Sequence, residues 1–421
     1  MKESIKKRIE AVRHGEVPEG YIFENHQLRP EGWQYEKIGN FLVAYDEFSN
    51  DTGAYPLATS SRQGLMLQSE YYNDQRYEET TGGFHVVPEG YVTYRHMSDD
   101  DIFRFNVNRM GTPVLVRPEY PVFTTSDGLC QGLLIAYLNN MKEFTAYCSA
   151  QKKGSTRTRM YFSRLGEFVM PIPPVSEQKK IAEILATCDR VIELKQQLLE
   201  KKRRQKQWLM QKLLDPKSDV RLPEFKDREW IDTPLSSLCE FAGGGTPDTS
   251  NEQYWNGTIP WISSADLKEN NIYSIEITRH ISEEAVRCSA AKICPQNSIL
   301  IVSRVGVGKI AIAPVDLCTS QDFTNLVNVK GNLYFIALQL QQAIQRILSM
   351  SQGTSIKGIT SKEVKAIEIS LPSRDEQDAI ARVLECSDRE ISLCEQEIET
   401  WHQKKKALMH LLLTGLVRVN A

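Results

Sequence analysis

The chain has 421 residues, of which 41% are hydrophobic and 25% are charged, and its formal net charge is −3. This composition excludes both an intrinsically disordered chain and a membrane protein, and the length predicts two or more domains. The slight acidity excludes a uniformly basic nucleic-acid-binding protein, although cations gathered on one face, or supplied by a partner subunit, would still permit DNA binding.

The sequence contains no apolar run long enough for a membrane helix, and its start lacks the apolar stretch of a signal peptide. We therefore expect a cytoplasmic protein. The nine cysteines include no Cys-x-x-Cys spacing, which favours reduced, structural thiols.

The first part of the chain, residues 1–165, is predicted to be rich in short strands. Alternating apolar runs such as Thr112–Val116 are broken by Gly, Pro, Asn and Asp, as is typical of strands joined by turns. A basic loop with small hydroxyl residues follows near residue 155, and such side chains suit phosphate oxygens and guanine edges. A solvated surface loop is the alternative. The candidate DNA contacts in this loop are Lys152, Lys153, Ser155, Thr156, Arg157 and Arg159.

An internal repeat follows, because residues 173–192 align without a gap with residues 372–391, a shift of 199 residues that takes Glu177 to Glu376. Each copy begins with proline and then has few helix breakers, which predicts long helices near residues 176–214 and 374–413. Ser373 and Glu376 predict a capping box at the start of the second helix, and Gly415 predicts its end.

Both helices repeat apolar residues in alternating steps of four and three, which predicts a heptad seam of the kind found in coiled coils. Lys195, Lys202 and Lys206 weaken this seam in the middle of the first helix. A second stripe beside it, Ile184, Val191 and Leu198, indicates docking of another protein or, as an alternative, packing onto the chain's own domains. The predicted spacer contacts are Ile181, Leu185, Ile192, Leu199, Leu209, Leu213, Ile380, Leu384, Ile391, Ile398, Leu408 and Leu412.

Residues 221–363 predict a second strand-rich domain. Both domains have a tryptophan near their start, Trp33 in the first and Trp230 in the second, but the rest of their sequences are dissimilar. Similar helices combined with two dissimilar domains favour a protein in which the helices hold two different recognition domains. Divergent duplication without functional meaning is the alternative. The candidate DNA contacts of this domain are Arg304, Lys309, Thr354, Ser355 and Lys357.

Two glycine-rich segments of the second domain fail as nucleotide motifs. The segment Gly306–Lys309 lacks the first glycine and the final hydroxyl residue of a phosphate-binding loop, so we interpret it as a turn between strands. The run Gly243–Gly245 lacks the spacing of a dinucleotide fingerprint and is interpreted as a loop. The sequence also lacks zinc, amino-methyltransferase, nuclease and ATPase motifs, which favours a binding protein without a catalytic or metal site.

The duplicated Pro-Pro-x-x-Glu-Gln-x-x-Ile-Ala motif, with Leu-Leu-Thr-Gly-Leu-Val-Arg-Val near the end, resembles the two helical regions of type I restriction-modification specificity subunits. The Gly-Gly-Thr-Pro and Ile-Pro-Trp-Ile stretches are similar to the openings of their target-recognition domains. The first helix departs from this pattern, because residues 214–218 lack the Thr-Gly ending.

The resemblance implies an α+β fold with two target-recognition domains separated by two long antiparallel helices. Each domain would read half of a bipartite site in double-stranded DNA, and the helices would hold two modification (methyltransferase) subunits and, through them, restriction subunits. S-adenosylmethionine, ATP and magnesium would be bound by those partners, and this chain would hold no cofactor. A helix over residues 176–214 would be about 58 Å long, which suits half-sites about 34–36 Å apart.

We therefore divide the chain into a first recognition domain (1–165), a first helical region with its connector (166–220), a second recognition domain (221–363) and a second helical region (364–421). Two alternatives remain open at this point. One is a coiled-coil scaffold that does not bind DNA, and the other is an enzyme with an unrecognised site.

Overall fold

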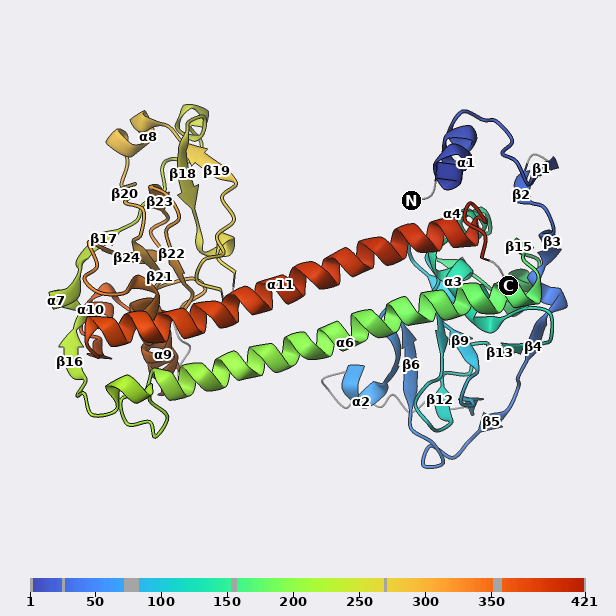
Figure 1. Cartoon of the computed structure of the whole chain (residues 1–421), viewed down its shortest axis with the longest axis horizontal. Coiled ribbons are helices and arrows are strands. Elements are labelled where there is room, and N and C mark those ends of the chain that lie inside the picture. The colour runs from blue at the N-terminus through green and yellow to red at the C-terminus, as the bar shows by residue number, and fades with distance from the viewer. Residues whose placement is uncertain are drawn as a thin grey trace. The chain divides into compact units, whose positions relative to one another are not determined.

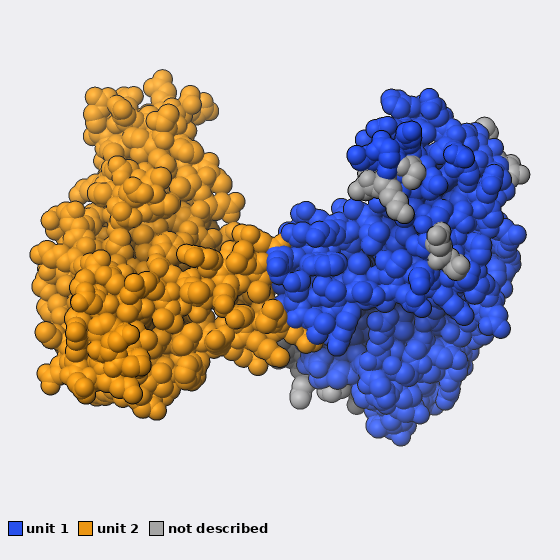
Figure 2. Space-filling model, in the orientation of Figure 1, with its two compact units in different colours: residues 1–196, 397–421 blue, residues 197–396 orange. Residues whose placement is uncertain are grey.

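The computed structural model describes residues 3–24, 27–71, 83–152, 157–268, 271–350 and 358–419. The chain forms two compact units, residues 1–196 with 397–421 and residues 197–396 (Figure 2). Two long helices, α6 (Val175–Leu213) and α11 (Arg374–Leu413), each contribute one part to each unit (Figure 1). The mixed helix and strand content confirms the predicted α+β fold with two long helices. None of the described helices combines the length and apolar character needed to cross a membrane.

The first unit surrounds the start of α6 and the end of α11 with short strands and helices. Its remaining helices are α1 (Glu3–Arg13), η1 (Ile38–Asn40), α2 (Gln68–Tyr71), α3 (Gln131–Asn140), α4 (Lys142–Ala150) and α5 (Phe162–Gly166). Its strands are β1 (Tyr21–Glu24), β2 (Gln27–Pro30), β3 (Gln34–Lys37), β4 (Leu42–Ala44), β5 (Phe48–Ser49), β6 (Ala58–Ser61), β7 (Gly64–Leu67), β8 (Phe84–Val87), β9 (Val92–Tyr94), β10 (Met97–Ser98), β11 (Phe105–Val107), β12 (Val114–Val116), β13 (Val122–Thr125), β14 (Thr158–Arg159) and β15 (Val169–Ile172).

The second unit is built in the same manner around the end of α6 and the start of α11. Its remaining helices are η2 (Pro223–Phe225), α7 (Leu235–Leu238), η3 (Glu252–Trp255), η4 (Ser264–Asp266), α8 (Glu283–Cys288), α9 (Leu333–Met350) and α10 (Ser361–Lys365). Its strands are β16 (Ile231–Pro234), β17 (Glu240–Gly243), β18 (Ile259–Ile262), β19 (Arg279–Ile281), β20 (Ile293–Cys294), β21 (Ile299–Val302), β22 (Ile310–Ile312), β23 (Leu317–Thr319), β24 (Phe323–Val327) and β25 (Glu368–Leu371).

Each unit contains a four-stranded antiparallel sheet with the same topology. The order is β11-β9-β13-β4 in the first unit and β22-β21-β24-β17 in the second, so that strands equivalent in chain order occupy equivalent places. The repeat continues into the strand pairs β3 with β15 and β16 with β25. The two domains that look unlike in sequence therefore share the topology of a four-stranded sheet and of a two-stranded pair.

The helices are part of the globular cores. In the first unit Ile181 and Leu412 belong to the same buried cluster as Phe123 and Leu133. In the second unit Leu213 and Ile380 are buried with Phe335 on α9. Burial of these faces, at about 25 cal/mol per Å² of apolar surface, stabilises each helix against its own unit.

Several local predictions have clear outcomes. The strand near residues 112–116 and the turn at Gly306 and Gly308 are confirmed, and both of these glycines have positive φ (84° and 95°). Gly415 ends α11 as predicted, with φ of 70°. Gly243 was predicted in a loop but is the last residue of β17, because its backbone pairs with Thr324.

The capping box predicted at the start of α11 is wrong. The carboxylate of Glu376 accepts hydrogen bonds from the Arg221 guanidinium (2.7 Å) and the Trp230 indole (3.2 Å) instead of folding back onto Ser373. The Ser373 hydroxyl accepts a hydrogen bond from Arg228. A cationic donor competes for a buried carboxylate more strongly than a neutral backbone amide does.

Candidate nucleic-acid interface

The start of α6 is tied to the first unit by Glu177, which is 2% exposed. Both of its carboxylate oxygens accept hydrogen bonds from the Arg418 guanidinium at 2.8 Å, and one also accepts from the Trp33 indole at 3.0 Å. The guanidinium lies 5.8 Å from the Trp33 ring centroid. Hydrogen bonding to Glu177 raises the pKa of Arg418 above its ordinary value. A residue that follows α11 therefore helps to fix the start of α6.

The second unit repeats this arrangement with the roles of the helices exchanged. Glu376 at the start of α11 accepts hydrogen bonds from Trp230 and from Arg221, which follows the end of α6. Arg221 lies 5.7 Å from the Trp230 ring centroid. Each unit thus contains a Trp-Glu-Arg cluster. It joins the residue before a strand (β3 or β16), the start of one long helix and the segment after the end of the other long helix.

The glutamine that follows each glutamate anchors a loop of its own unit. The Gln178 side chain accepts a hydrogen bond from the Cys130 backbone N–H (2.6 Å) and donates to the Gly128 carbonyl (2.7 Å). Gln377 accepts from the Asn332 backbone N–H at 2.9 Å. These two loops lead into α3 and α9, so the repeated Glu-Gln pair positions equivalent helices in both units.

The predicted spacer residues fall into two groups. Those near the helix ends are packed into the globular cores, and those in the middle stretches belong to neither core cluster among the described residues. The core group is Ile181, Leu185, Leu408 and Leu412 in the first unit and Leu209, Leu213, Ile380 and Leu384 in the second. The middle group is Ile192 and Leu199, which are buried, and Ile391 and Ile398, which are half-buried.

Ion pairs line the helix pair within each unit. In the first unit Lys405 bonds Asp189, and Lys195 lies 2.6 Å from Glu397. In the second unit the repeat-equivalent Lys206 bonds Asp388 at 2.5 Å. Because residues early in one helix meet residues late in the other, the pairing is antiparallel in each unit. The lysines that interrupt the apolar seam, including Lys195, therefore have acidic partners on the opposite helix.

The basic loop predicted to contact DNA in the first unit is largely neutralised. Arg157 lies 2.6 Å from Asp99, and Lys152 lies 3.8 Å from Asp101. Arg159, in contrast, is exposed and has no ion-pair partner among the described residues. Lys153, Ser155 and Thr156 lie outside the described residues.

The partners of those cations form an acidic turn, Asp99–Asp101, which sequence reasoning missed. Asp101 adopts φ of 63°, and its carboxylate also accepts the Thr158 hydroxyl. Asp100 bonds Arg62 at 2.5 Å, and this contact holds the pKa of the Asp100 carboxyl below its usual range. The turn lies some fifty residues before the basic loop in sequence, and only the fold brings the two together.

Sequence reasoning also missed a group of residues beside Arg159. Met160 is fully buried, so the alternation of an extended segment directs Arg159 and Tyr161 outward together. The Tyr161 ring is 51% exposed and stacks on His96, with centroids 5.8 Å apart. Arg95, next to His96, is exposed. The signal was the period-two alternation around Met160, which continues past Arg159.

In the second unit, the two candidate DNA contacts that the structure describes differ in their hydrogen bonding. Lys309 donates hydrogen bonds to the backbone carbonyls of Leu267 (3.2 Å) and Ser264 (3.4 Å), so it is engaged within the fold. Arg304 is exposed and has neither a hydrogen bond nor an ion pair among the described residues. The other candidates, Thr354, Ser355 and Lys357, lie outside the described residues.

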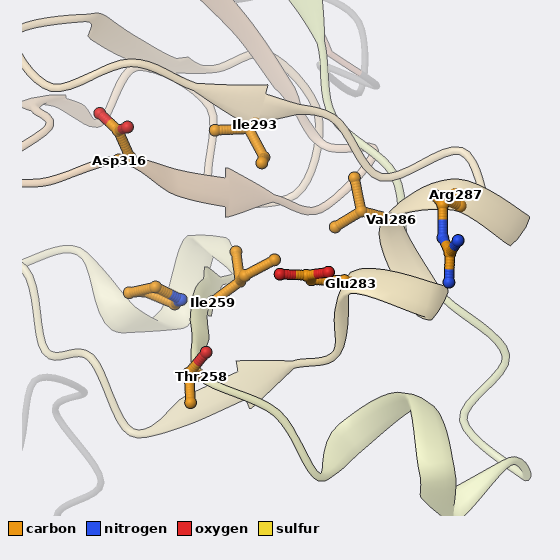
Figure 3. Close-up of a pocket in the computed structure, with 8 residues that line it drawn as sticks. Thr258, Ile259, Glu283, Val286, Arg287, Ile293 and Asp316 are labelled. Carbon is orange, nitrogen blue, oxygen red and sulfur yellow. The ribbon is translucent and has the colours of Figure 1, made fainter.

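Two cavities of the second unit differ in charge. One, about 530 Å³, is lined by the apolar Ile259 and Val286 and by the charged Glu283, Asp316 and Arg287 (Figure 3). The other, about 480 Å³, is lined by Arg304 and Lys365 and by no acidic residue of the described chain. Because a polyanion is repelled by carboxylates, only the second cavity suits nucleic acid. The described residues also contain no cluster of three His, Cys, Asp or Glu that could hold a metal ion.

Comparison with known proteins agrees with this architecture. Residues 120–201 and 227–400 match the family model described as "Type I restriction modification DNA specificity domain". The chain is 34% identical over 166 residues to the MjaIX specificity subunit of Methanocaldococcus jannaschii, an alignment that spans 38% of each chain. It is 27% identical over 298 residues, 68% of each chain, to the putative MjaX specificity subunit of the same organism.

The fold is similar to that of a solved relative. The crystal structure of the type I restriction-modification S subunit from M. genitalium superposes with a TM-score of 0.56 at 15% sequence identity, covering 90% of this chain and 96% of the other. The family model covers more than half of the chain, and it includes most of both repeated helices. The chain belongs to the family of type I restriction-modification DNA specificity domains.

Proposed function

We propose that this chain selects the DNA site of a type I restriction-modification complex. Its two units would each read one half of a bipartite, asymmetric site in double-stranded DNA, with residues 1–165 and 221–363 as the recognition domains. The target would be methylated by two modification subunits docked on the chain, with restriction subunits joining through them.

The proposal rests on one observation: the two units share the same internal framework, but the side chains on their surfaces differ. Both units share the Trp-Glu-Arg cluster, the helix-anchoring glutamine and the four-stranded sheet order. The residues around those sheets differ, since Arg159 and Tyr161 of the first unit correspond, at the shift of 199 residues, to Gly358 and Thr360 of the second. One frame with two different sets of surface side chains suits two different half-sites, because base choice depends on which side chains reach the groove edges.

Exposed apolar residues on the long helices support docking of partner subunits. Leu194 of the first unit is 47% exposed, and Leu393 and Trp208 of the second are 54% and 48% exposed. Residues of this kind on otherwise charged helices are typical of protein–protein contacts. A coiled-coil scaffold without DNA binding has no observation in its favour.

The chemistry would belong to the partners. S-adenosylmethionine, ATP and magnesium would be bound by the modification and restriction subunits, and this chain would contribute no catalytic group or cofactor site. Methyl transfer by the isolated chain would contradict this part of the proposal and would favour an enzyme.

A domain exchange tests the function. Residues 221–363 are replaced by the matching segment of another specificity subunit, and the chain is co-expressed with its modification subunits. Genome-wide mapping of methylated adenines should show one half of the target changed and the other half retained. If both halves change, or neither does, the two units do not read separate half-sites.

A further inference from the structure

A cleft in the second unit gathers free cations on its walls. The cavity of about 480 Å³ lies between the end of β17, the residues after β21 and the segment that leads into α10. We call it the cation cleft. The lining residues that matter here are Gly243, Ser303, Arg304, Gln321, Thr360 and Lys365.

The two cations of the cleft are available to a ligand. Arg304 is exposed and has no hydrogen bond or ion pair within the described chain. Lys365 is exposed, and its ammonium lies 5.4 Å from the ring centroid of Phe241, a contact that holds it along the wall without neutralising its charge. A cation that rests on an aromatic face keeps its attraction for anions. Within the described part of the chain, the cleft therefore carries two positive charges that have no ion-pair partner.

Several other polar side chains of the cleft are bonded within the protein. The Ser303 hydroxyl donates to the Asp322 carbonyl at 3.0 Å, and the Gln321 amide oxygen accepts the Thr246 hydroxyl. Thr360 is bonded to Glu363, which caps α10. These oxygens are thus engaged within the protein, while two positive charges are free, and free positive charge on a cleft wall suits a phosphate.

The floor of the cleft allows close approach. A β-carbon added at Gly243 would meet no atom within 4 Å, so the backbone at this end of β17 is open. The neighbouring Gly244 is different, because a β-carbon there would lie 2.1 Å from the Ser320 carbonyl oxygen. Gly244 is required by packing, whereas Gly243 leaves space beside the two cations.

The first unit places cations at the equivalent point. The Ile359 backbone N–H donates to the Ser303 carbonyl in the second unit, and the repeat-equivalent Met160 donates to the His96 carbonyl in the first, both at 2.8 Å. In each unit this contact joins the segment before a short helix to the end of the second strand of the shared sheet. In the first unit Arg95 and Arg159 are adjacent in sequence to this contact. In the second unit Arg304 directly follows Ser303, and Lys365 is the last residue of α10.

We propose that the cation cleft holds a backbone phosphate of duplex DNA, with Arg304 and Lys365 positioning the second unit on the duplex without reading its sequence. This inference rests on the proposed function, because it assumes that the unit faces DNA. A phosphate contact of this kind is sequence-independent and strongly dependent on salt.

The test uses the full chain with co-expressed modification subunits and a short fluorescein-labelled duplex of random sequence. Fluorescence anisotropy gives the dissociation constant over a salt series for the wild type, Arg304→Gln, Lys365→Gln and the double variant. Each single change should reduce the slope of log affinity against log salt by about 1, and the double change by about 2. The matched control is Arg287→Gln, an exposed arginine at the other cavity of the same unit, which should keep the wild-type slope.

The outcomes separate the inference from the proposed function. If the wild type binds the duplex and both cleft variants keep its slope, the cation cleft does not hold a DNA phosphate, although the proposed function stands. If the wild type shows no salt-dependent binding, both fail. Competition by inorganic phosphate beyond that of chloride at equal ionic strength, present in the wild type and absent in the double variant, would support a phosphate ligand in the cleft. An Arg287→Gln effect equal to those of the cleft variants would overturn the inference, because any surface cation would then suffice.

Discussion

Arg418, close to the end of the sequence, bonds both carboxylate oxygens of Glu177 in the first turn of α6 at 2.8 Å. The equivalent carboxylate, Glu376, is bonded differently. Its Oε1 accepts both donors, Arg221 and Trp230, while its Oε2 is buried without a hydrogen-bond partner among the described residues. Both carboxylate oxygens of the cluster are therefore hydrogen-bonded in the first unit, whereas only one is hydrogen-bonded in the second.

This difference predicts unequal costs for the same substitution. Glu177→Gln places an amide N–H where an oxygen now faces a donor, and it removes the negative charge that pairs with the Arg418 guanidinium. We therefore expect a loss of about 3 kcal/mol in the free energy of unfolding of the first unit. Glu376→Gln should cost less, because its amide can occupy the position of the unbonded Oε2. Hydrogen–deuterium exchange mass spectrometry measures the two units separately.

The control is Glu183→Gln, an exposed glutamate on α6. It should change the free energy of unfolding by less than about 0.5 kcal/mol. Equal destabilisation by Glu177→Gln and Glu376→Gln would contradict the proposed role of hydrogen-bond satisfaction.

The helices were predictable from the sequence, but their attachments were only partly so. A 3.5-residue period and residue identities repeated at a fixed shift can both be read directly from the sequence. They predicted the bounds of α6 and α11 closely. Trp33 and Trp230 stood out as repeated cues, yet their partners Glu177 and Glu376 lie about 145 residues away. Such a pairing is a property of the fold, which no local pattern encodes.

Neither the sheet that the two units share nor the ion pairing of the candidate DNA-binding cations could be predicted from the sequence. The sheet strands are only three to five residues long, for example β9 and β24, and their sequences differ between the units. The prediction for the basic loop weighed the charges of Arg157 and Lys152 without the distant aspartates that bond them. Lys365 was missed because its position beside Arg304 depends on tertiary structure.

Lys206 and Lys405 occupy equivalent positions in the repeat but have unequal surroundings. The Lys206 side chain is 12% exposed, and its partner Asp388 also accepts the Tyr334 hydroxyl. The Lys405 side chain is 25% exposed, and its partner Asp189 is 58% exposed.

We therefore expect Lys206→Met to lower the free energy of unfolding by about 1–2 kcal/mol, because it leaves a half-buried carboxylate with a single donor. Lys405→Met should cost less than about 0.5 kcal/mol, as is typical of exposed ion pairs. Urea denaturation followed by hydrogen–deuterium exchange in each unit measures both values. A larger cost for Lys405→Met would show that burial does not determine the strength of these pairs.

His96 predicts a pH dependence of the first unit. Burial lowers the pKa of His96, against the opposing charge of Glu119, and the Nδ1 atom is buried without a hydrogen-bond partner among the described residues. The unfolded chain, with a histidine pKa of about 6.5, therefore takes up the proton first as the pH falls. The free energy of unfolding should be constant above that value and should decrease as the pH falls toward the folded-state pKa.

The variant His96→Phe keeps a ring for the contact with Tyr161 and removes the titrating group. It should flatten the decrease in the free energy of unfolding between about pH 7 and pH 5. His14→Gln, at an exposed position after α1, serves as the control and should retain the wild-type dependence. A His96→Phe profile identical to the wild type would assign the pH dependence to other groups.

The acidic turn predicts a substitution that strengthens DNA binding. Asp99 and Asp101 neutralise Arg157 and Lys152, which would otherwise attract phosphates. Asp99→Asn combined with Asp101→Asn removes both charges, and asparagine tolerates the left-handed backbone at position 101.

Under the proposed function, each cation released should increase the slope of log affinity against log salt for a random duplex by about 1, with tighter binding at low salt. The control Asp127→Asn removes an exposed negative charge elsewhere in the same unit and tests whether net charge alone produces the effect. Because Asp99 lies 2.6 Å from Arg157 whereas Asp127 has no such partner among the described residues, only the paired variant should alter the slope. An unchanged slope would show that Arg157 and Lys152 do not face the duplex, and would leave Arg95 and Arg159 as the cations through which the first unit contacts DNA.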